Sequence, residues 1–315
     1  MSSPAQPRNP GPSWGYRFLR GCDRCLPEFI FKPLRALGTW ISVAAMPTQR
    51  RHSRAYLERV LGRRPHLLDT FRHFFAFEEM LMLKLRIANG RSHRPEIAAD
   101  AAHFRGFAQS GEAVLLGTFH IGHSDIFGFL LGPRENHRVF MVRQRVGNSH
   151  DVETLGRLYS KWLSFIWVND PENLLFALKD AVASGGSVAM KCDRVDFSAK
   201  TEAFEFLGAR RIFPFTIYHL ALIFKRPVFL SVGLPQGSEA SVLHGAPRWD
   251  PDPQRSRAEN LASARIHFQN FLQKVETLLR ENPYSWFNFT ELNPIAPPPR
   301  DAAPATTPRR LTPSR

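Results

Sequence analysis

The 315-residue sequence contains only three cysteines, which is too few for a disulfide-stabilised scaffold and is typical of a reducing compartment. Cys22 and Cys25 form a Cys-x-x-Cys pair, whereas Cys192 lies far away in the chain. No second pair accompanies the first, and no predicted strand leads into it. We therefore interpret this pair as chance spacing on a helix rather than as a zinc or redox site.

Long apolar runs are missing too. A membrane-spanning helix needs about 20 consecutive apolar residues, and the best candidate, residues 29–46, is interrupted by Lys32, Pro33 and Arg35. The opening residues, MSSPAQPRNPGPS, are polar and proline-rich, so we expect no cleavable signal peptide. These absences predict a protein that stays in the cytosol and lies on a membrane rather than crossing it.

Acidic residues are scarce: 28 Asp and Glu face 42 Lys and Arg, for a net charge of +14. The excess is concentrated at the start of the chain, where the first 65 residues hold twelve basic and three acidic side chains. Such asymmetry indicates an anionic partner, which could be nucleic acid, an anionic lipid surface or an acidic protein. An ordinary solvated basic face is the alternative.

Aromatic residues favour the lipid surface among these partners. The basic residues at 17–35 are interleaved with aromatic residues between positions 14 and 40. Amphipathic rings and long cationic side chains both fit the headgroup region of a bilayer. The sequence has no recognisable nucleic-acid-binding motif, so we expect no nucleic-acid partner.

The chain divides into a helical part and an alternating part. Residues 14–89 show helical spacing, and we interpret them as a membrane-facing region. Short apolar runs follow at 113–119, 138–142, 164–168, 187–192 and 227–234, separated by helical stretches such as 151–163, 171–185 and 257–281. This alternation predicts an α/β fold with a mixed, mostly parallel sheet flanked by helices, preceded by a basic helical N-terminal region.

No linker interrupts residues 14–294, which we interpret as one domain. Residues 1–13 form a polar leader, and residues 295–315 are rich in Pro, Ala and Thr without periodicity. We predict that both ends are disordered.

The segment HIGHSD places His120 and Asp125 where a predicted strand gives way to a helix. Side chains five apart on a continuous helix point about 140° apart. If the chain turns at Gly122, however, Asp125 can reach back to His120. A carboxylate on one ring nitrogen would fix the tautomer and leave the other nitrogen free as a general base.

Two other interpretations of this segment stay open on spacing alone. Asp125 or Ser124 can be a helix cap and His120 a buried structural histidine. His120, His123 and Asp125 can also be metal ligands, although their spacing matches no common metal motif.

Several blocks together resemble the lysophospholipid acyltransferase superfamily, and within it the bacterial lipid A biosynthesis (late acyltransferase) family. His-x4-Asp is followed by MVRQR with Arg143 and Arg145, and by GGSVAMKCDR with Asp193 and Arg194. FEFLGARRIFPFT and NPYSWFNF come next in the order of that family. The resemblance covers about residues 14–292.

The resemblance implies a cofactor-independent acyltransferase that moves a fatty acyl chain from a thioester to a lipid acceptor. The donor would be acyl carrier protein or acyl-CoA, and the place would be the cytoplasmic face of the bacterial inner membrane. By the same resemblance, His120 is the general base and Asp125 its orienting partner. Arg143 and Arg145 would hold an anionic part of a substrate. Asp193 and Arg194 would border the same cleft, with an ion pair closing a loop as the alternative.

Overall fold

The computed structural model describes residues 13–130, 138–144, 163–169, 171–196, 198, 200–237 and 240–297. The predicted leader, apart from Ser13, lies outside the described residues, as does most of the predicted C-terminal tail. The helix predicted at 151–163 lies outside them except for its last residue.

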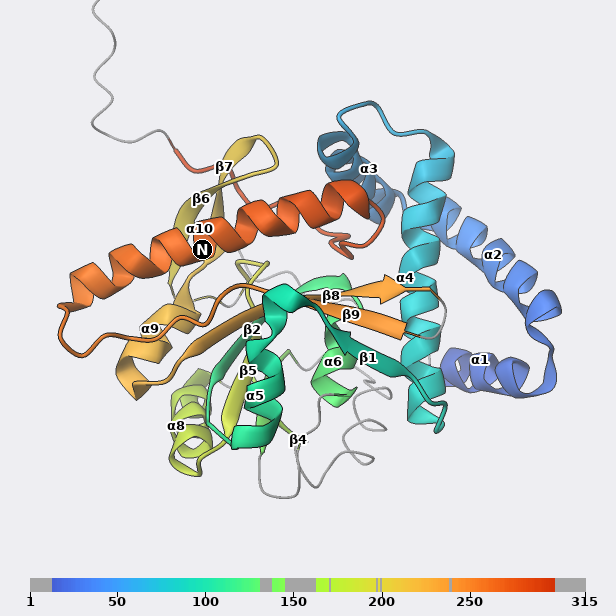
Figure 1. The fold of residues 1–315 in the computed structure, drawn as a ribbon. Helices are drawn as coiled ribbons and strands as arrows, with labels where there is room; N and C mark the ends of the chain where they lie inside the picture. The colour runs from blue at the N-terminus through green and yellow to red at the C-terminus, as the bar shows by residue number, and fades with distance from the viewer. Residues whose placement is uncertain are drawn as a thin grey trace, which may run out of the picture.

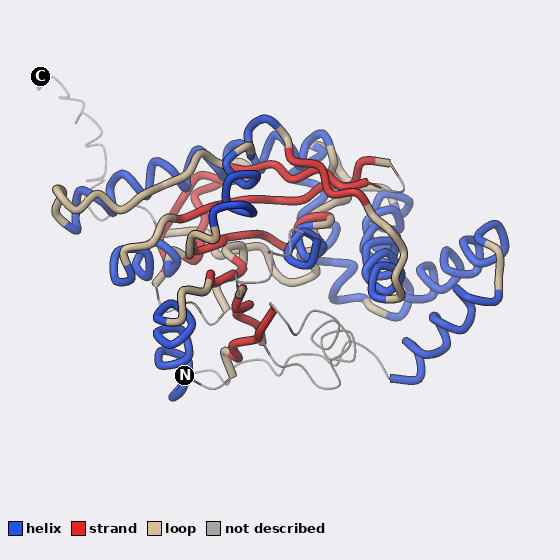
Figure 2. The backbone as a smooth tube through the Cα atoms, turned by 60° about the horizontal axis from the view of Figure 1, so that its bottom comes forward, coloured by secondary structure: helices blue, strands red, loops and turns tan. Residues whose placement is uncertain are grey.

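A seven-stranded mixed sheet forms the centre of the molecule (Figures 1 and 2). In order across the sheet its strands are β1 (Arg94–Ile97), β9 (Ala240–Gly245), β8 (Val228–Gln236), β2 (Leu115–Gly122), β5 (Ser187–Lys191), β3 (Val139–Arg143) and β4 (Leu163–Trp167). Every neighbouring pair is parallel except β8 and β9. The predicted α/β class with a mostly parallel sheet is confirmed.

The five strands predicted from apolar runs are β2, β3, β4, β5 and β8, each within a few residues of its predicted position. The pattern missed the edge pair β1 and β9. β1 has the sequence RPEI and is mostly exposed, so it carries no apolar run that could reveal it. Proline and charge are typical of strands at the edge of a sheet.

Helices cover both faces of the sheet. On one face, a continuous apolar core joins the sheet to α8 (Pro171–Ala183), α9 (Thr216–Phe224) and α10 (Arg257–Glu281). On the other face, a smaller core lies under the 3-10 turn η1 (Ala99–Ala101), α5 (His103–Ser110) and α6 (Ser124–Leu130). This arrangement leaves the carboxyl ends of the parallel strands as the place where a site can open.

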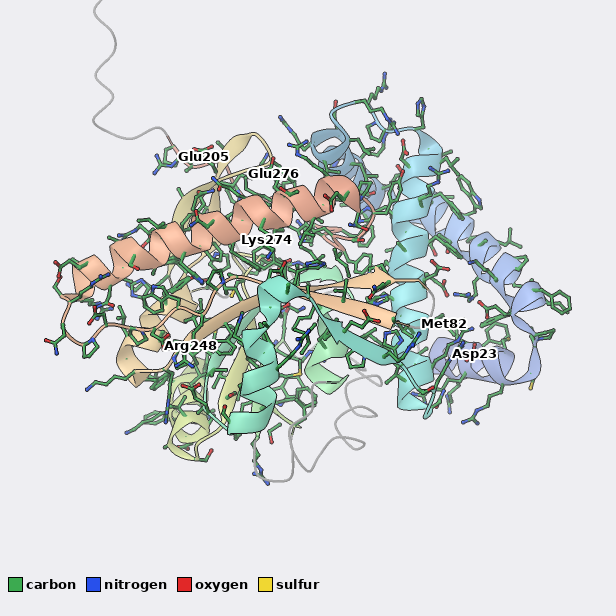
Figure 3. The ribbon with its side chains drawn as sticks, viewed as in Figure 1. Asp23, Met82, Glu205, Arg248, Lys274 and Glu276 are labelled. Atoms are coloured by element: carbon green, nitrogen blue, oxygen red, sulfur yellow. The ribbon has the colours of Figure 1, made fainter. Side chains whose placement is uncertain are left out.

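A two-stranded hairpin, β6 (Thr201–Phe206) and β7 (Ala209–Pro214), packs beside α10. Leu207 and Gly208 form its turn, both with positive φ, which is the geometry of a tight two-residue hairpin. Glu276 of α10 accepts a hydrogen bond from the Leu207 amide at 2.8 Å (Figure 3). Ile295, at the start of the predicted tail, still pairs with Arg211 of β7.

Four helices precede the sheet: α1 (Ser13–Cys25), α2 (Glu28–Ala45), α3 (Pro47–Leu61) and α4 (Leu67–Ala88). The inner face of α2, which packs on α4, carries a buried guanidinium: Arg35 pairs with Glu28 and with Glu78 of α4. An ion pair also joins the C-terminal end of α1 to α4, since Asp23 pairs with Arg86 of α4 (Figure 3). Charged groups therefore share the inside of this helical region with a small apolar cluster of Phe31, Met82 and Leu85.

The outer face of α2 is apolar. Its exposed side chains recur at helical spacing and form what we call the α2 apolar face: Phe29, Ile30, Leu34, Leu37 and Ile41. A helix on the surface of a water-soluble protein normally shows the opposite distribution. Figure 1 shows α1 and α2 on the side of α4 that faces away from the sheet. None of the described helices is both long and apolar enough to cross a bilayer.

A buried histidine joins this helical region to residues 282–297, which follow α10 and which we call the C-terminal segment. His73 of α4 donates from Nε2 to the Trp286 carbonyl at 2.8 Å and accepts at Nδ1 from the Ser53 hydroxyl at 2.8 Å. His73 and Ser53 are fully buried. Burial disfavours the imidazolium form and lowers the pKa of His73 to about 4.

We predict that acid destabilises the protein partly through His73. Its pKa is about 6.5 in the unfolded chain and about 4 in the folded chain, so its contribution is complete above pH 6.5. As the pH falls from 6.5 to 4, about 3 kcal/mol of unfolding free energy is lost. Urea unfolding at pH 7 and pH 4.5 should show a smaller pH effect in His73→Gln. An equal effect in both proteins would contradict the assignment.

Candidate active site

The chain turns sharply where β2 passes into α6. Gly122 has φ of +45°, and a Cβ there would lie 2.6 Å from the Gly233 carbonyl oxygen. The Gly233 carbonyl accepts from the His123 amide at 2.9 Å, and the Gly233 amide donates to Ser124 Oγ at 2.8 Å. Only glycine fits this close approach with this φ. The predicted turn at Gly122 is therefore present, and it places Asp125 in the first turn of α6.

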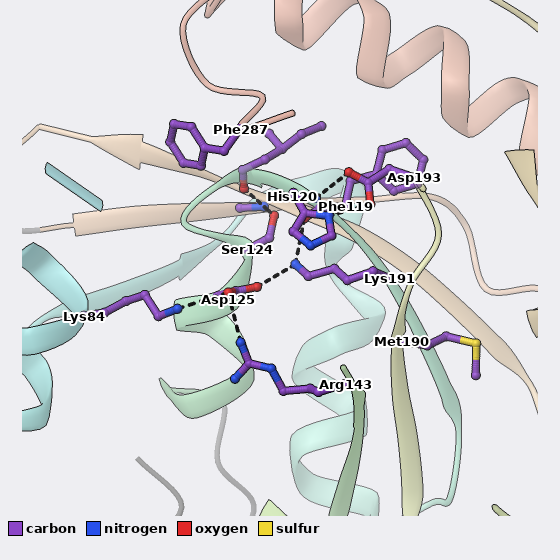
Figure 4. A network of polar contacts seen from close by, with 12 residues as sticks. Lys84, Phe119, His120, Ser124, Asp125, Arg143, Met190, Lys191, Asp193 and Phe287 are labelled. Carbon is purple, nitrogen blue, oxygen red and sulfur yellow. Dashed lines mark hydrogen bonds and ion pairs between the residues drawn. The ribbon is translucent and has the colours of Figure 1, made fainter. Parts of the chain in front are cut away.

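His120 stands near the end of β2 and is held by Asp193, which follows β5. Its Nδ1 donates to Asp193 Oδ1 at 2.8 Å, and its backbone amide donates to Asp193 Oδ2 at 2.8 Å (Figure 4). An ionised carboxylate only accepts hydrogen bonds, so the proton of neutral His120 lies on Nδ1 and Nε2 is left as the basic nitrogen. The His120 side chain keeps 30% exposure, whereas Asp193 has none.

Trp286 completes the environment of Asp193. Its indole Nε1 donates to Asp193 Oδ2 at 2.9 Å, and the indole is buried against Tyr56 and Phe206. The backbone around Trp286 binds the His120 strand directly, because the Phe287 amide donates to the His120 carbonyl at 2.8 Å. The NPYSWFNF block is thus a structural brace for the histidine.

Asp125 makes no hydrogen bond to His120, which corrects the orienting role that the family resemblance implied for it. Its Oδ1 lies 2.6 Å from the ammonium of Lys191, and its Oδ2 lies 3.1 Å from that of Lys84. The guanidinium of Arg143 is at 4.0 Å. Three cations on three elements therefore surround Asp125 (Figure 4). The physical reason is that α6 turns the carboxylate toward α4, β3 and β5, while Asp193 takes the ring nitrogen.

The other predicted binding residues divide between the site and the undescribed part of the chain. Arg143 ends β3, contacts Asp125 and lies over the Phe165 ring. Arg194 donates to the Phe287 carbonyl at 3.0 Å and does not pair with its neighbour Asp193 in an ion pair that closes a loop. Arg145 lies outside the described residues.

A cavity of about 390 Å³ opens at the carboxyl ends of β2, β3 and β5. The charged and titratable side chains that line it are His120, Asp125, Arg143, Lys191, Arg194 and Asp196. The remaining wall is largely apolar and is made by β3, β5, α8 and α9, through Met141, Leu174, Leu178, Met190, Ile217 and Leu220. The cavity therefore joins a base and several cations to a space suited to a hydrocarbon chain.

The metal-ligand interpretation does not fit the geometry. His120 points to Asp193 and His123 to Ser241, whose hydroxyl lies 2.6 Å from His123 Nδ1. In the part of the chain that the structure describes, no three His, Cys, Asp or Glu side chains converge as ligands. Burial and the nearby His93 lower the pKa of His123 to about 4, which keeps this imidazole neutral.

Electrostatics keep His120 neutral and both carboxylates ionised. Burial lowers the pKa of His120 against the opposing attraction of Asp193, and Arg194 and Lys191 lower it further. Burial would raise the pKa of Asp193, but His120 and Arg194 hold it well below its ordinary value. The pKa of Asp125 is likewise held down, despite burial, by its cations. At neutral pH the site therefore holds an unprotonated base.

Three residues of the site were not predicted from the sequence: Lys84, Lys191 and Trp286. Lys84 lies between leucines in the apolar run MLMLKLRI, and Lys191 ends the apolar strand SVAMK. A charge in a buried segment needs a partner, so both lysines carried a usable signal. Trp286 lay within a block that the family resemblance had singled out.

Comparison with known proteins gives only distant structural likeness. No family model matches the chain, and no curated protein sequence matches it. The crystal structure of the 1-acyl-sn-glycerophosphate (LPA) acyltransferase PlsC from Thermotoga maritima is similar over 82% of this chain and 98% of its own. The sequence identity is 13% and the TM-score 0.35. A likeness this distant assigns no activity, so the chemistry has to come from the site itself.

We predict that Asp193, and not Asp125, governs the protonation of His120. Asp193→Asn removes the attraction that opposes burial, so the pKa of His120 should fall further below its ordinary value. Asp125→Asn should change it less, because Asp125 makes no hydrogen bond to the ring. Titration by NMR of protein labelled with nitrogen-15 in histidine measures both. A larger effect from Asp125→Asn would reverse the assignment.

Proposed function

We propose that this protein is an acyltransferase that moves a fatty acyl chain from an acyl thioester to a hydroxyl or amine of a lipid acceptor. The observation that carries the proposal is the position of His120. It is a neutral imidazole held at Nδ1 by Asp193, and it lines a cavity that has cations in its polar part and a largely apolar remaining wall. The motif resemblance supports the same reaction class.

In the proposed reaction His120 Nε2 takes the proton of the acceptor O–H or N–H as that atom attacks the thioester carbonyl carbon. A tetrahedral intermediate with an oxyanion forms. Its C–S bond then breaks, and the departing thiolate takes the proton back from the imidazolium. Asp193 keeps the ring oriented and stabilises its charged form between the two transfers. No covalent acyl-enzyme is needed.

The side chains around His120 argue for this direct attack. Cys192 lines the cavity, but burial raises the pKa of its thiol to about 12, so it is no thiolate at neutral pH. Ser124 donates its hydroxyl proton to the Ile121 carbonyl at 2.6 Å and not to His120. Neither residue is therefore an activated nucleophile.

The cavity wall suits the acyl chain, and the cations suit the polar parts of the substrates. Met141, Leu178 and Ile217 belong to its apolar wall. Arg143 and Arg194 border the same cavity, and guanidinium groups bind phosphate well. Acyl carrier protein and acyl-CoA both present a phosphorylated pantetheine arm, so either fits as donor. The acyl thioester is then a substrate, and the reaction as proposed requires no cofactor.

The helical region gives the reason to expect a lipid acceptor. We propose that the α2 apolar face enters the headgroup region of an anionic membrane and that the exposed Arg17 and Arg24 of α1 add positive charge to the binding. Charge complementarity favours an anionic bilayer over a neutral one. We propose a peripheral position at the cytoplasmic face of a bacterial inner membrane, which is the place that the family resemblance implies.

We predict that His120→Ala reduces acyl transfer at least a hundredfold without unfolding the protein, because removal of a general base costs about that much. Purified protein, a bacterial lipid extract and either acyl carrier protein or CoA loaded with palmitate form the assay. Mass spectrometry should show lipids that gain one acyl mass. Equal activity in His120→Ala would refute the base.

The same assay separates two other functions. Free fatty acid without an acylated lipid would show a hydrolase, in which the dyad activates water. An intact donor despite bound lipid would show a membrane-binding protein without turnover. Either result with the unsubstituted protein would overturn the transfer proposal.

We predict that Leu34→Glu with Ile41→Glu lowers binding to vesicles containing phosphatidylglycerol at least tenfold. Two half- to two-thirds-exposed apolar side chains on one helix face would then have to carry charge into the bilayer. Ile266→Glu is the matched control, since Ile266 on α10 is 65% exposed. Vesicle sedimentation measures both. Equal loss in the two variants would show that the α2 apolar face is not the docking surface.

A further inference from the structure

Lys191 is the last residue of β5, and its ammonium lies within the site. Its Nζ donates to the Phe119 carbonyl at 2.9 Å and lies 2.6 Å from Asp125 Oδ1. Phe119 directly precedes His120 on β2, so this contact ties the ammonium to the strand that carries the base. Figure 4 shows Nζ beside the imidazole, on the side of the ring that faces Asp125.

The ammonium retains one donor for a ligand. It has three N–H groups, and the carbonyl and the carboxylate take two. Among the described residues, the third has no acceptor in the protein. Lys191 lines the cavity together with His120, and its side chain is 23% exposed. A fixed cationic donor beside the base is what a developing negative charge requires.

We propose that Lys191 stabilises the oxyanion of the tetrahedral intermediate and that Asp125 serves to hold Lys191 in place. This inference rests on the proposed acyl transfer. As the acceptor bonds to the thioester carbon, the carbonyl π-electron pair moves to oxygen, and the third N–H of Lys191 donates to that oxygen. When the C–S bond breaks, the electron pair returns and the hydrogen bond weakens. Lys191 keeps its proton throughout.

The other cations of the site are less well placed for this task. Lys84 pairs with Asp125 from the α4 side and does not line the cavity. Arg143 lies 4.0 Å from Asp125 and over the Phe165 ring. Arg194 is directed to the Phe287 carbonyl on the C-terminal segment. Lys191 is the cation that two short contacts fix next to His120.

The position of Lys191 beside the ring also affects the protonation of His120. Lys191 is among the groups that lower the pKa of His120 below its ordinary value. A positive charge beside the ring disfavours imidazolium before the acceptor arrives. Once the oxyanion has formed, its negative charge offsets that repulsion, so the imidazolium becomes favourable only with the intermediate. The ammonium therefore favours the transition state over the resting state.

The test compares Lys191→Met with Lys84→Met, which removes a partner of the same carboxylate but no donor from the cavity. Palmitoyl transfer is measured with both variants. The ketone analogue of palmitoyl-CoA, in which a methylene replaces the sulfur and the carbonyl carbon is carbon-13, reports the hydrogen bond without turnover. Infrared difference spectra give the stretching frequency of its bound carbonyl.

We expect Lys191→Met to lower kcat about 10²–10³-fold, the loss typical of a missing oxyanion donor, with little change in KM. Lys84→Met should lose less than tenfold. The bound carbonyl should absorb at lower frequency in the unsubstituted protein and in Lys84→Met than in Lys191→Met. Equal kcat in the two variants, or a carbonyl frequency that Lys191→Met leaves unchanged, would overturn the assignment.

Failure of the proposed function has a different signature. If the unsubstituted protein binds the analogue with the lowered carbonyl frequency but transfers no acyl chain to lipid, the transfer proposal fails and the Lys191 contact stands. If the analogue binds to none of the three proteins, the thioester substrate is wrong and the role of Lys191 falls with it.

Discussion

The structure depends on a single buried carboxylate, that of Asp193. It has no exposure, and it remains ionised because the His120 backbone amide, the His120 ring and the Trp286 indole donate to it and the nearby charge of Arg194 attracts it. A hydrogen bond to a charged group contributes about 1.5–3 kcal/mol, whereas an unpaired buried charge costs several times more. The end of β2, the loop after β5 and the C-terminal segment must therefore meet at this point.

Two carboxylates share the site but have different surroundings. Asp193 is bound by neutral donors and a histidine, while Asp125 is bound by ammonium and guanidinium groups. The first can respond to a change in the charge of His120, because the ring nitrogen binds this carboxylate directly. The second is already neutralised by fixed cations. One carboxylate thus suits proton transfer and the other suits the positioning of positive charge.

Local features of the site could be predicted from the sequence, and long-range contacts could not. The turn at Gly122 and the strand before it follow from the apolar run and the glycine, which are properties of neighbouring residues. The partner of His120 is 73 positions away along the chain. Spacing favours Asp125 because it is near in sequence, yet which carboxylate reaches the ring depends on how β2 and β5 pair.

The strands also divide into those that the local sequence predicts and those that depend on long-range pairing. β2, β5 and β8 are buried and read as continuous apolar runs, whereas β1 is short and polar and needs β9 to exist as a strand. The outward orientation of the α2 apolar face also cannot be predicted from periodicity alone. An amphipathic pattern gives two faces, and the burial of Arg35 against Glu78, on the same face as Phe31 and Val43, shows which face lies inside.

The C-terminal brace has a consequence for biosynthesis. Ribosomes make the chain from its first residue, so the strand with His120 and the loop with Asp193 emerge long before Trp286. Until that indole arrives, the Asp193 carboxylate lacks one of its donors and the His120 carbonyl lacks the Phe287 amide. A nascent chain can therefore form most of its sheet while the histidine is still loosely held. Order at the reactive centre comes only after Trp286 has been synthesised.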